Sequence, residues 1–250
     1  MAYNEFAYFY DEFNDDANYQ SLFSYIKRNF EKYGVFDGIV ADLGCGTGDL
    51  TLLLAEAGYD MIGVDLSQEM LSVLRDKAEQ VGKNDILLLQ QNLLKLDLYG
   101  TIKAAVSTFD TFNHIGNYDM FSKALMRASL FIEPNGVFIF DLNTIYKQQQ
   151  VLADNTFILE ADDARCKWEN HYDEIEARTL IKINITYKEE KTSFNENFYE
   201  YAFTQSQIND ACEAAGLYIT EICDGETFTQ LREDSQRYLI TAIKKEIFNA

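Results

Sequence analysis

Between residues 38 and 142, short apolar runs alternate with stretches in which apolar residues recur every three to four positions. Strands that are apolar on both faces need a sheet covered by helices on each side. The alternation therefore predicts an α/β fold with a Rossmann-like, doubly wound, mostly parallel sheet. The apolar runs lie at 38–43, 59–65, 85–91, 103–109 and 137–142.

Helical spacing predicts helices at 18–33, 49–57, 67–81 and 118–131. Ser67 suits the N-cap of the third helix, and Glu69 follows in its first turn. Glu133–Gly136, which holds the one proline of the chain, predicts a turn before the fifth strand.

The period changes to two between Thr156 and Phe203. In the stretch 178–188, apolar and polar residues alternate, as in a half-buried antiparallel strand. Similar strands are expected at 165–172 and 195–203. A helix capped by Ser206 is expected next. Two further strands, at 217–223 and 236–244, then complete a seven-stranded main sheet. We therefore expect a main domain of residues 1–155 and 204–250, with an inserted antiparallel β lid at 156–203.

The composition excludes several partners. The formal net charge is −20, from 41 acidic and 21 basic residues, and such a surface repels the phosphates of nucleic acid. No stretch reaches the roughly 20 apolar residues that cross a membrane, and the N-terminus lacks a basic signal region. The four cysteines form no CxxC pair and no zinc spacing. We expect a cytoplasmic protein with free thiols and no metal site, membrane or nucleic-acid partner.

A glycine loop follows the first predicted strand, with glycines at Gly44, Gly46 and Gly48. Glycines allow a tight strand-to-helix turn and a close approach of backbone to a ligand. In a dinucleotide-binding loop the third glycine usually falls five residues after the first, where Asp49 stands here. The loop is therefore typical of a nucleotide-like ligand but not specifically of a dinucleotide.

Two carboxylates beside this loop narrow the range of ligands that it could bind. Asp42, at the end of the first strand, would repel a pyrophosphate and suits a ligand with a cationic amino-acid portion. Asp65 ends the second strand, where a carboxylate can accept hydrogen bonds from both ribose hydroxyls. The alternatives are a solvated strand-end carboxylate for Asp42 and a helix N-terminal acid for Asp65.

These motifs resemble those of the class I S-adenosylmethionine-dependent methyltransferases, and the resemblance covers nearly all of the chain. Val40–Gly48, which includes Cys45, is similar to their first motif. Gly63–Ser67 with Met70 is similar to the second, and Gln91-Asn92 to the third. The resemblance implies S-adenosyl-L-methionine as the cofactor.

The resemblance also implies individual cofactor contacts. Asn92 stands where the family often has Asp, and it would accept a hydrogen bond from the adenine amino group between Leu66 and Leu93; alternatively it caps its own turn. The segment 5–13 resembles the N-terminal segment of the small-molecule branch, in which a tyrosine covers the methionine end of the cofactor. Tyr10 matches that tyrosine and is a candidate catalytic residue, Tyr19 is a second candidate, and packing is the alternative for both.

The methyl-transfer site is expected just past the fourth strand, in the segment 107–115. This segment resembles that of the sugar N,N-dimethyltransferases, in which a histidine at the place of His114 is a candidate base. Helix capping or a structural hydrogen bond is the alternative. Phe109 and Asp110 lie at a strand end where cofactor contacts are expected, and Asp110 and Asn113 could bind polar groups of the substrate.

The inserted sheet is expected to fold over this site. Its candidate substrate contacts are Trp168, Arg178 and Tyr199, with Tyr172 and Tyr201 as further possibilities; packing is the alternative for each. His171 alternates with Tyr172 along a strand and is not expected to be a ligand.

We therefore expect transfer of a methyl group to nitrogen or oxygen of a small polar molecule, by a monomer or homodimer. Three alternatives remain open: a protein methyltransferase, a non-catalytic module that binds S-adenosylmethionine, and an NAD-dependent oxidoreductase. The glycine spacing and Asp42 argue against the oxidoreductase.

Overall fold

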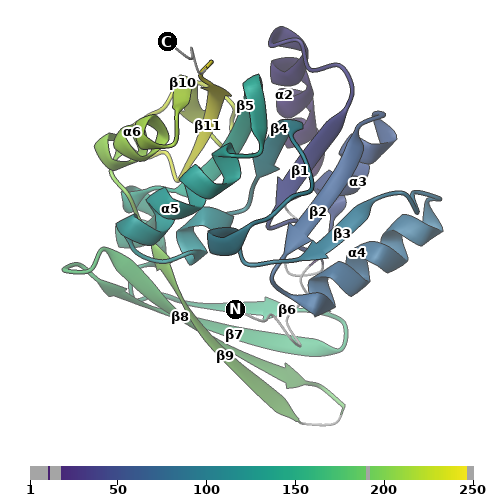
Figure 1. Cartoon of the computed structure of the whole chain (residues 1–250). Coiled ribbons are helices and arrows are strands. Elements are labelled where there is room, and N and C mark those ends of the chain that lie inside the picture. The colour runs from purple at the N-terminus through teal and green to yellow at the C-terminus, as the bar shows by residue number, and fades with distance from the viewer. Residues whose placement is uncertain (1–10, 12–17, 190–191, 247–250) are drawn as a thin grey trace.

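A computed structural model describes residues 11, 18–189 and 192–246. Its larger sheet has seven strands in the order β10-β11-β5-β4-β1-β2-β3 (Figure 1). The five strands from β5 to β3 are parallel, and β11 runs antiparallel to both β5 and β10. The strands are β1 (Ile39–Leu43), β2 (Asp60–Asp65), β3 (Leu87–Gln90), β4 (Ile102–Ser107), β5 (Ile132–Asn143), β10 (Leu217–Asp224) and β11 (Arg237–Lys244).

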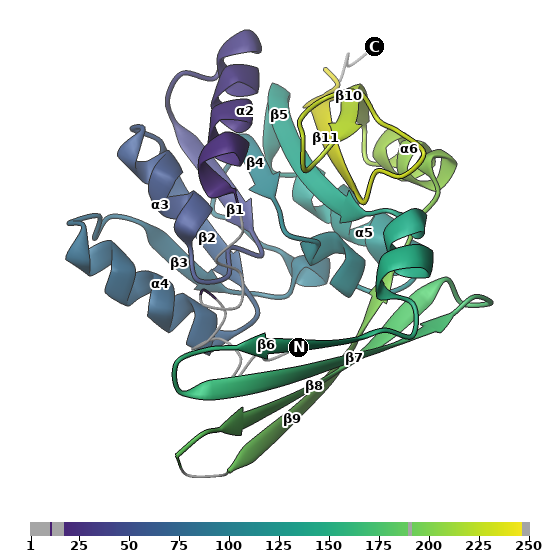
Figure 2. The same ribbon diagram turned by 180° about the vertical axis from the view of Figure 1, so that it is seen from behind.

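Helices cover both faces of this sheet, which confirms the predicted doubly wound architecture. Buried residues of α2 and α3 form one core with one face of the sheet, and buried residues of α5 and α6 form a second core with the other face. Figure 2 shows α2, α3 and α4 together on the near side. The helices are α2 (Tyr19–Lys32), α3 (Asp49–Glu56), α4 (Gln68–Gln80), α5 (Tyr118–Ser129) and α6 (Gln205–Ala214).

Strand β5 shows why these sequences fold as buried strands. Phe138 and Phe140 point into the core with α5 and α6, whereas Val137 and Ile139 point into the core with α2 and α3. All four side chains are fully buried, because alternate residues of a strand face opposite sides.

The inserted segment forms a second, four-stranded antiparallel sheet, called the lid sheet below, in the order β6-β7-β8-β9. In β8, Ile181, Ile183 and Ile185 are buried and alternate with more exposed residues, as the period of two predicts. Its strands are β6 (Thr156–Glu160), β7 (Ala164–Asp173), β8 (Arg178–Tyr187) and β9 (Ser193–Tyr201).

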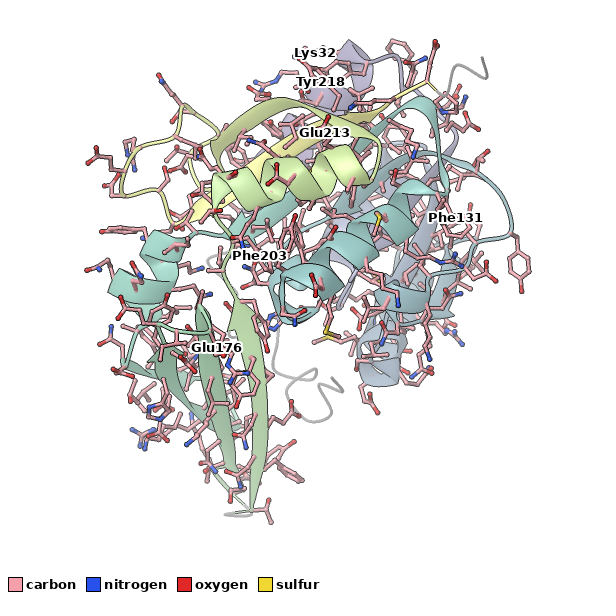
Figure 3. The ribbon with its side chains drawn as sticks, turned by 60° about the vertical axis from the view of Figure 1, so that its left-hand side comes forward. Lys32, Phe131, Glu176, Phe203, Glu213 and Tyr218 are labelled. Atoms are coloured by element: carbon pink, nitrogen blue, oxygen red, sulfur yellow. The ribbon has the colours of Figure 1, made fainter. Side chains whose placement is uncertain are left out.

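The lid sheet lies beside the main sheet at the edge where β1, β2 and β4 end (Figure 1). Figure 3 shows Phe203 at the point where the chain leaves β9 and approaches α6. The Phe203 ring stacks on Phe121 of α5 with centroids 4.4 Å apart, so this exit is anchored in the core. The division into domains at 155/156 and 203/204 stays a prediction.

Two local predictions differ from the structure. The N-cap of α6 is Thr204, not Ser206, because Thr204 and Gln207 form a reciprocal capping box that fixes the start of the helix. The segment 133–136 is not a separate turn but part of β5, where the register with β4 shifts and Asn135 takes a φ of 65°. Ser67 caps α4 as predicted, accepting from the amide of Met70.

Three short helical turns follow the ends of the strands and were not predicted. They are η1 (Leu93–Lys95) after β3, η2 (Thr111–His114) after β4, and the π-helix η3 (Lys147–Leu152) after β5. Such turns carry side chains to the carboxyl edge of the sheet, where ligands bind in this architecture. In the described part of the chain, no helix is long and apolar enough to cross a membrane.

Candidate functional site

A cavity of about 410 Å³ opens at the carboxyl edge of the main sheet and continues under the lid sheet. It contains most of the residues that the sequence singles out. The predicted residues that line it are Tyr19, Asp42, Gly44, Cys45, Gly46, Asp65, Leu66, Met70, Gln91, Asn92, Leu93, Phe109, Asp110, His114 and Trp168. Tyr10 lies outside the described residues.

The three loop glycines have different surroundings. A side chain on Gly44 would collide with Thr111, and one on Gly48 would collide with Leu74 of α4. Gly48 does not line the cavity, so its close contact is with the protein rather than with a ligand. Gly46 lines the cavity and has open space where a side chain would be, so a ligand can approach its backbone closely.

Asp42 lies buried at the floor of this cavity, where its Oδ2 accepts a hydrogen bond of 2.6 Å from the hydroxyl of Thr51. Burial and, to a smaller extent, the neighbouring charge of Asp65 raise the pKa of Asp42 to about 7, against the opposing effect of the hydrogen bond from Thr51. A nearby cation stabilises the ionised form of a buried carboxyl whose pKa is raised. The site therefore suits the amino group of an amino-acid ligand.

Asp65 closes the other side of the glycine loop. Its carboxylate accepts from the backbone amides of Gly46 (3.0 Å) and Ser67 (2.8 Å). Burial raises the pKa of Asp65, and these two hydrogen bonds oppose the rise. Each carboxylate oxygen keeps a second acceptor site, so Asp65 can still accept a hydrogen bond from a ligand hydroxyl.

The residues predicted to hold an adenine have structural roles as well. Oδ1 of Asn92 accepts from the amide of Leu94 at 2.9 Å, so Asn92 does cap its own turn while lining the cavity. The side chain of Gln91 makes hydrogen bonds to both backbone groups of Asp97, and this fixes the loop around η1. Leu66 remains 41% exposed, which leaves an apolar surface free to cover a ring.

Past β4, the backbone is held in an unusual conformation. Phe109 and Asp110 have φ values of 55° and 59°, which residues other than glycine rarely adopt. Buried Asp141 accepts from both of their amides, at 2.8 and 2.7 Å, and pairs with Arg237 at 2.9 Å. The Phe109 ring lies 4.8 Å from that of Tyr19, centroid to centroid. Asp141 thus fixes the wall of the cavity.

Beyond Phe109, polar side chains from four elements meet around the amide of Asn143. Its Nδ2 donates to Asp110 (2.8 Å) and to Glu200 (2.9 Å), and its Oδ1 accepts from Lys147 (3.0 Å). Gln148 also donates to Glu200, at 2.8 Å. Asp110, Asn143, Lys147 and Glu200 line the cavity, and we call this region the acceptor end.

His114 also lies at the acceptor end, on η2. Its Nε2 is 3.8 Å from Oε1 of Glu200, and its ring packs edge-on against Phe198 with centroids 5.2 Å apart. Phe198 in turn packs edge-on against Trp168 at 6.2 Å. The part of the lid sheet that lines the cavity therefore consists of two aromatic rings and one carboxylate, from Trp168, Phe198 and Glu200.

Three predicted substrate contacts lie elsewhere. Asn113 is fully buried and bonds to backbone groups of Asn143 and Tyr201, so its side chain joins η2 to β5 and β9. The guanidinium of Arg178 lies 4.4 Å over the ring of Tyr199, and neither residue lines the cavity. The structure thus brings Trp168 to the cavity but not Asn113, Arg178 or Tyr199.

Sequence reasoning missed Asp141, Asn143, Lys147, Glu200 and Arg237, all close to the acceptor end. Asp141 and Asn143 end the fifth strand, so the rule that ligands bind at carboxyl strand ends could have found them. Glu200 had no comparable signal, because acidic residues are common in exposed strands.

One cluster in the described ranges has the spacing of a metal site: Asp110, His114 and Glu200 bring their ligand atoms within 4.8 Å of one another. Glu200 already accepts from Asn143 and Gln148, and the amine of Lys147 interacts electrostatically with both carboxylates. The sequence predicts no metal here, and this stays a prediction.

Comparisons with known proteins agree with this geometry. A family model described as a methyltransferase domain matches residues 40–136, which hold the glycine loop, the strands β1 to β4 and the start of β5. The chain is 26% identical over 249 residues to a putative methyltransferase, YqeM, of Bacillus subtilis, and the match covers 98% of each protein.

Solved structures extend the similarity to the lid sheet. An S-adenosylmethionine-dependent methyltransferase from Clostridium acetobutylicum has a TM-score of 0.87 and 28% identity, covering 98% of this chain and 99% of that one. The amino pentose methyltransferase CalS10 of Micromonospora echinaspora, solved with its cofactor, has a TM-score of 0.74 at 14% identity and covers 98% of both chains. At that identity the second comparison shows a shared fold.

Proposed function

We propose that this class I S-adenosylmethionine-dependent methyltransferase transfers a methyl group to a nitrogen or oxygen atom of a small polar molecule. One observation carries the proposal. A single cavity joins the glycine loop with its two carboxylates to a second polar cluster around Asn143, under the lid sheet. Methyl transfer needs the cofactor and the acceptor side by side, and a joined cavity is suited to hold them in that way.

The residues of the first half suit S-adenosylmethionine, which supplies the methyl group when bound. Asp42 would meet the cationic amino-acid portion, because it is a buried carboxyl with a pKa raised by burial. Asp65 keeps acceptor sites for ribose hydroxyls, and Gly46 leaves room for close approach. Leu66 and Leu93 provide apolar surface for the adenine ring.

The acceptor end favours a group that carries or gains positive charge. The side chains of Asp110 and Glu200 line the cavity, and so do the aromatic rings of Trp168 and Phe198, which can also attract cations. An amine is therefore favoured over an alcohol within this proposal. The lid sheet covers the acceptor end, which favours a small molecule over an extended protein segment.

The first test is binding. Titration calorimetry should show binding of S-adenosylmethionine and S-adenosylhomocysteine to the full chain. Tight NADH binding without S-adenosylmethionine binding would instead support the oxidoreductase and overturn the proposal.

The second test is turnover. A panel of small amines, amino sugars, hydroxylated compounds and one basic peptide is incubated with the protein and S-adenosylmethionine, and release of S-adenosylhomocysteine is measured against a reaction without acceptor. We expect release above background with at least one small molecule. Release with the peptide alone would support a protein methyltransferase, and binding without release from any acceptor would support a non-catalytic module.

A further inference from the structure

Lys147 is a half-buried amine at the acceptor end whose position is fixed from several sides. It begins the π-helix η3 directly after β5, where its amide donates to the hydroxyl of Thr144 at 3.0 Å. Its side chain lines the cavity. A lysine on this turn therefore presents its Nζ to the same space that the acceptor would occupy.

The amide of Asn143 determines how Lys147 is held. Asn143 Nδ2 donates to Asp110 and to Glu200, so its Oδ1 must face the other way, toward Lys147. Nζ donates one hydrogen bond to that oxygen at 3.0 Å. A neutral amine has two hydrogens and one lone pair, so after this bond the lone pair remains available to a proton on a neighbouring group.

The charges around Lys147 come from four elements. Arg237 at the start of β11 repels its positive charge, whereas Asp110 before η2, Glu200 on β9 and Glu226 after β10 attract it. Burial, followed by the charge of Arg237, lowers the pKa of Lys147 against the attraction of the carboxylates. The positive charge that develops on the acceptor nitrogen beside Nζ during methyl transfer would lower the pKa of Lys147 further, since like charges repel.

From this arrangement we propose that Lys147 is a catalytic residue that accepts the proton released by the acceptor during methyl transfer. The inference rests on the proposed function and assigns to Lys147 the role of base, for which the sequence pattern indicates only His114. His114 and Glu200 lie across the same space, so their contribution is to hold and orient the acceptor.

In the reaction, the lone pair of the acceptor nitrogen or oxygen forms a bond to the methyl carbon as the carbon–sulfur bond breaks and its electron pair stays on sulfur. The proton of the acceptor atom then moves to the lone pair of Nζ. The ammonium formed on Lys147 is stabilised by the charges of Asp110 and Glu200, and it later loses the proton to water.

The first experiment needs no acceptor. The full chain, saturated with S-adenosylhomocysteine, is labelled with a trace of acetic anhydride at a series of pH values, and each lysine is quantified by mass spectrometry. Acetic anhydride reacts with the neutral amine, so the profile reports both protonation and access. We expect Lys147 to react and to reach half of its maximal rate at lower pH than exposed lysines such as Lys182. The proposal is overturned if Lys147 never reacts, or if its rate depends on pH in the same way as the rates of the exposed lysines.

The second experiment separates a proton acceptor from a mere positive charge. With the best acceptor of the panel, Lys147→Met should lower kcat at least 30-fold and leave the KM for S-adenosylmethionine within threefold. Lys147→Arg keeps the charge but cannot accept a proton near neutral pH, so it should be as slow as Lys147→Met. Lys182→Met, on an exposed position of β8, is the matched control and should keep full activity.

Recovery of half or more of the activity in Lys147→Arg overturns the proton-acceptor role, because a fixed charge would then suffice. Full turnover by Lys147→Met overturns it as well, and the proposed function still stands. Absence of turnover by the unaltered protein overturns the proposed function and with it this role. If Lys147→Met does not fold, the activity of Lys147→Arg and the labelling profile still decide whether Lys147 accepts the proton.

Discussion

Oε1 of Glu200 lies 3.8 Å from Nε2 of His114, although the two residues are separated by most of the lid sheet in sequence. Glu200 comes from strand β9, and His114 from the turn η2 after β4. The other oxygen of Glu200 is held by Asn143 and Gln148. Glu200, a residue of the lid sheet, is therefore held in place by residues outside that sheet and faces His114 across the acceptor end.

His114→Ala should lower turnover by at least about tenfold and change the Kd for S-adenosylmethionine by less than twofold, because His114 lines the acceptor end and not the glycine loop. Steady-state kinetics and calorimetry check the two parts. His171→Ala is the matched control, since His171 is the other histidine and its side chain is half exposed on β7. Equal activity of His114→Ala and His171→Ala would remove His114 from the mechanism.

Asp65→Ala should weaken cofactor binding by about 1–3 kcal/mol, through loss of charge-assisted hydrogen bonds to the ribose. The variant should also lose thermal stability, because the amides of Gly46 and Ser67 lose their acceptor. Calorimetry with S-adenosylhomocysteine and a melting curve measure the two effects. Asp60→Ala, at the exposed start of the same strand, should change neither. Unchanged affinity in Asp65→Ala would contradict the ribose assignment.

Asp42 predicts a pH dependence of stability in the protein without ligand. Its pKa is about 7 in the folded chain and 3.8 when unperturbed, as in the unfolded chain, so the unfolded chain releases this proton first as pH rises. The contribution of Asp42 to the free energy of unfolding therefore falls between about pH 4 and pH 7. Asp42→Asn should flatten this part of the profile, as measured by chemical denaturation across the range.

The same carboxyl predicts how cofactor affinity depends on pH. A cationic ligand favours the ionised form of Asp42, so binding should release a proton below about pH 7 and affinity should rise toward that pH. Calorimetry in two buffers of different ionisation enthalpy counts the proton. The calorimetric titrations are carried out only up to pH 7.5, because the α-amino group of the ligand titrates near pH 8. Proton release that persists unchanged in Asp42→Asn would place the effect elsewhere.

The main sheet could be predicted from sequence because its signal is local. The central strands β1, β4 and β5 are buried on both faces, and each helix repeats its apolar residues at one fixed spacing. Residues at or just after the strand ends, such as Asp42, Asp65 and His114, owe their positions to this order of elements. For that reason most predicted cofactor contacts line one cavity.

The lid side of the site could not be predicted in the same way. Along β9, Phe198 and Glu200 share one face, and Tyr199 lies on the other. Nothing in the alternation says which face turns inward, because the inward face carries a charged residue and the outward face an aromatic one. The helix start at Thr204 was missed for a related reason, since Thr204 and Ser206 are both suitable N-caps and only the partner Gln207 distinguishes them.

The inward and outward faces of the lid sheet predict different effects of substitution. Trp168 lines the cavity and packs against Phe198, so Trp168→Ala should raise the KM for the acceptor by about 3- to 30-fold, as expected for loss of an aromatic contact. Arg178 and Tyr199 stack on each other at 4.4 Å and do not line the cavity. Arg178→Ala and Tyr199→Ala should therefore each keep kcat and KM within twofold.

Steady-state kinetics of the three variants, with melting curves to confirm folding, give the comparison. Each outer-face variant loses the stack of Arg178 on Tyr199, so a small loss of melting temperature is expected in both. A loss of acceptor affinity in Arg178→Ala as large as that in Trp168→Ala would mean that the lid sheet presents its other face to the substrate during catalysis.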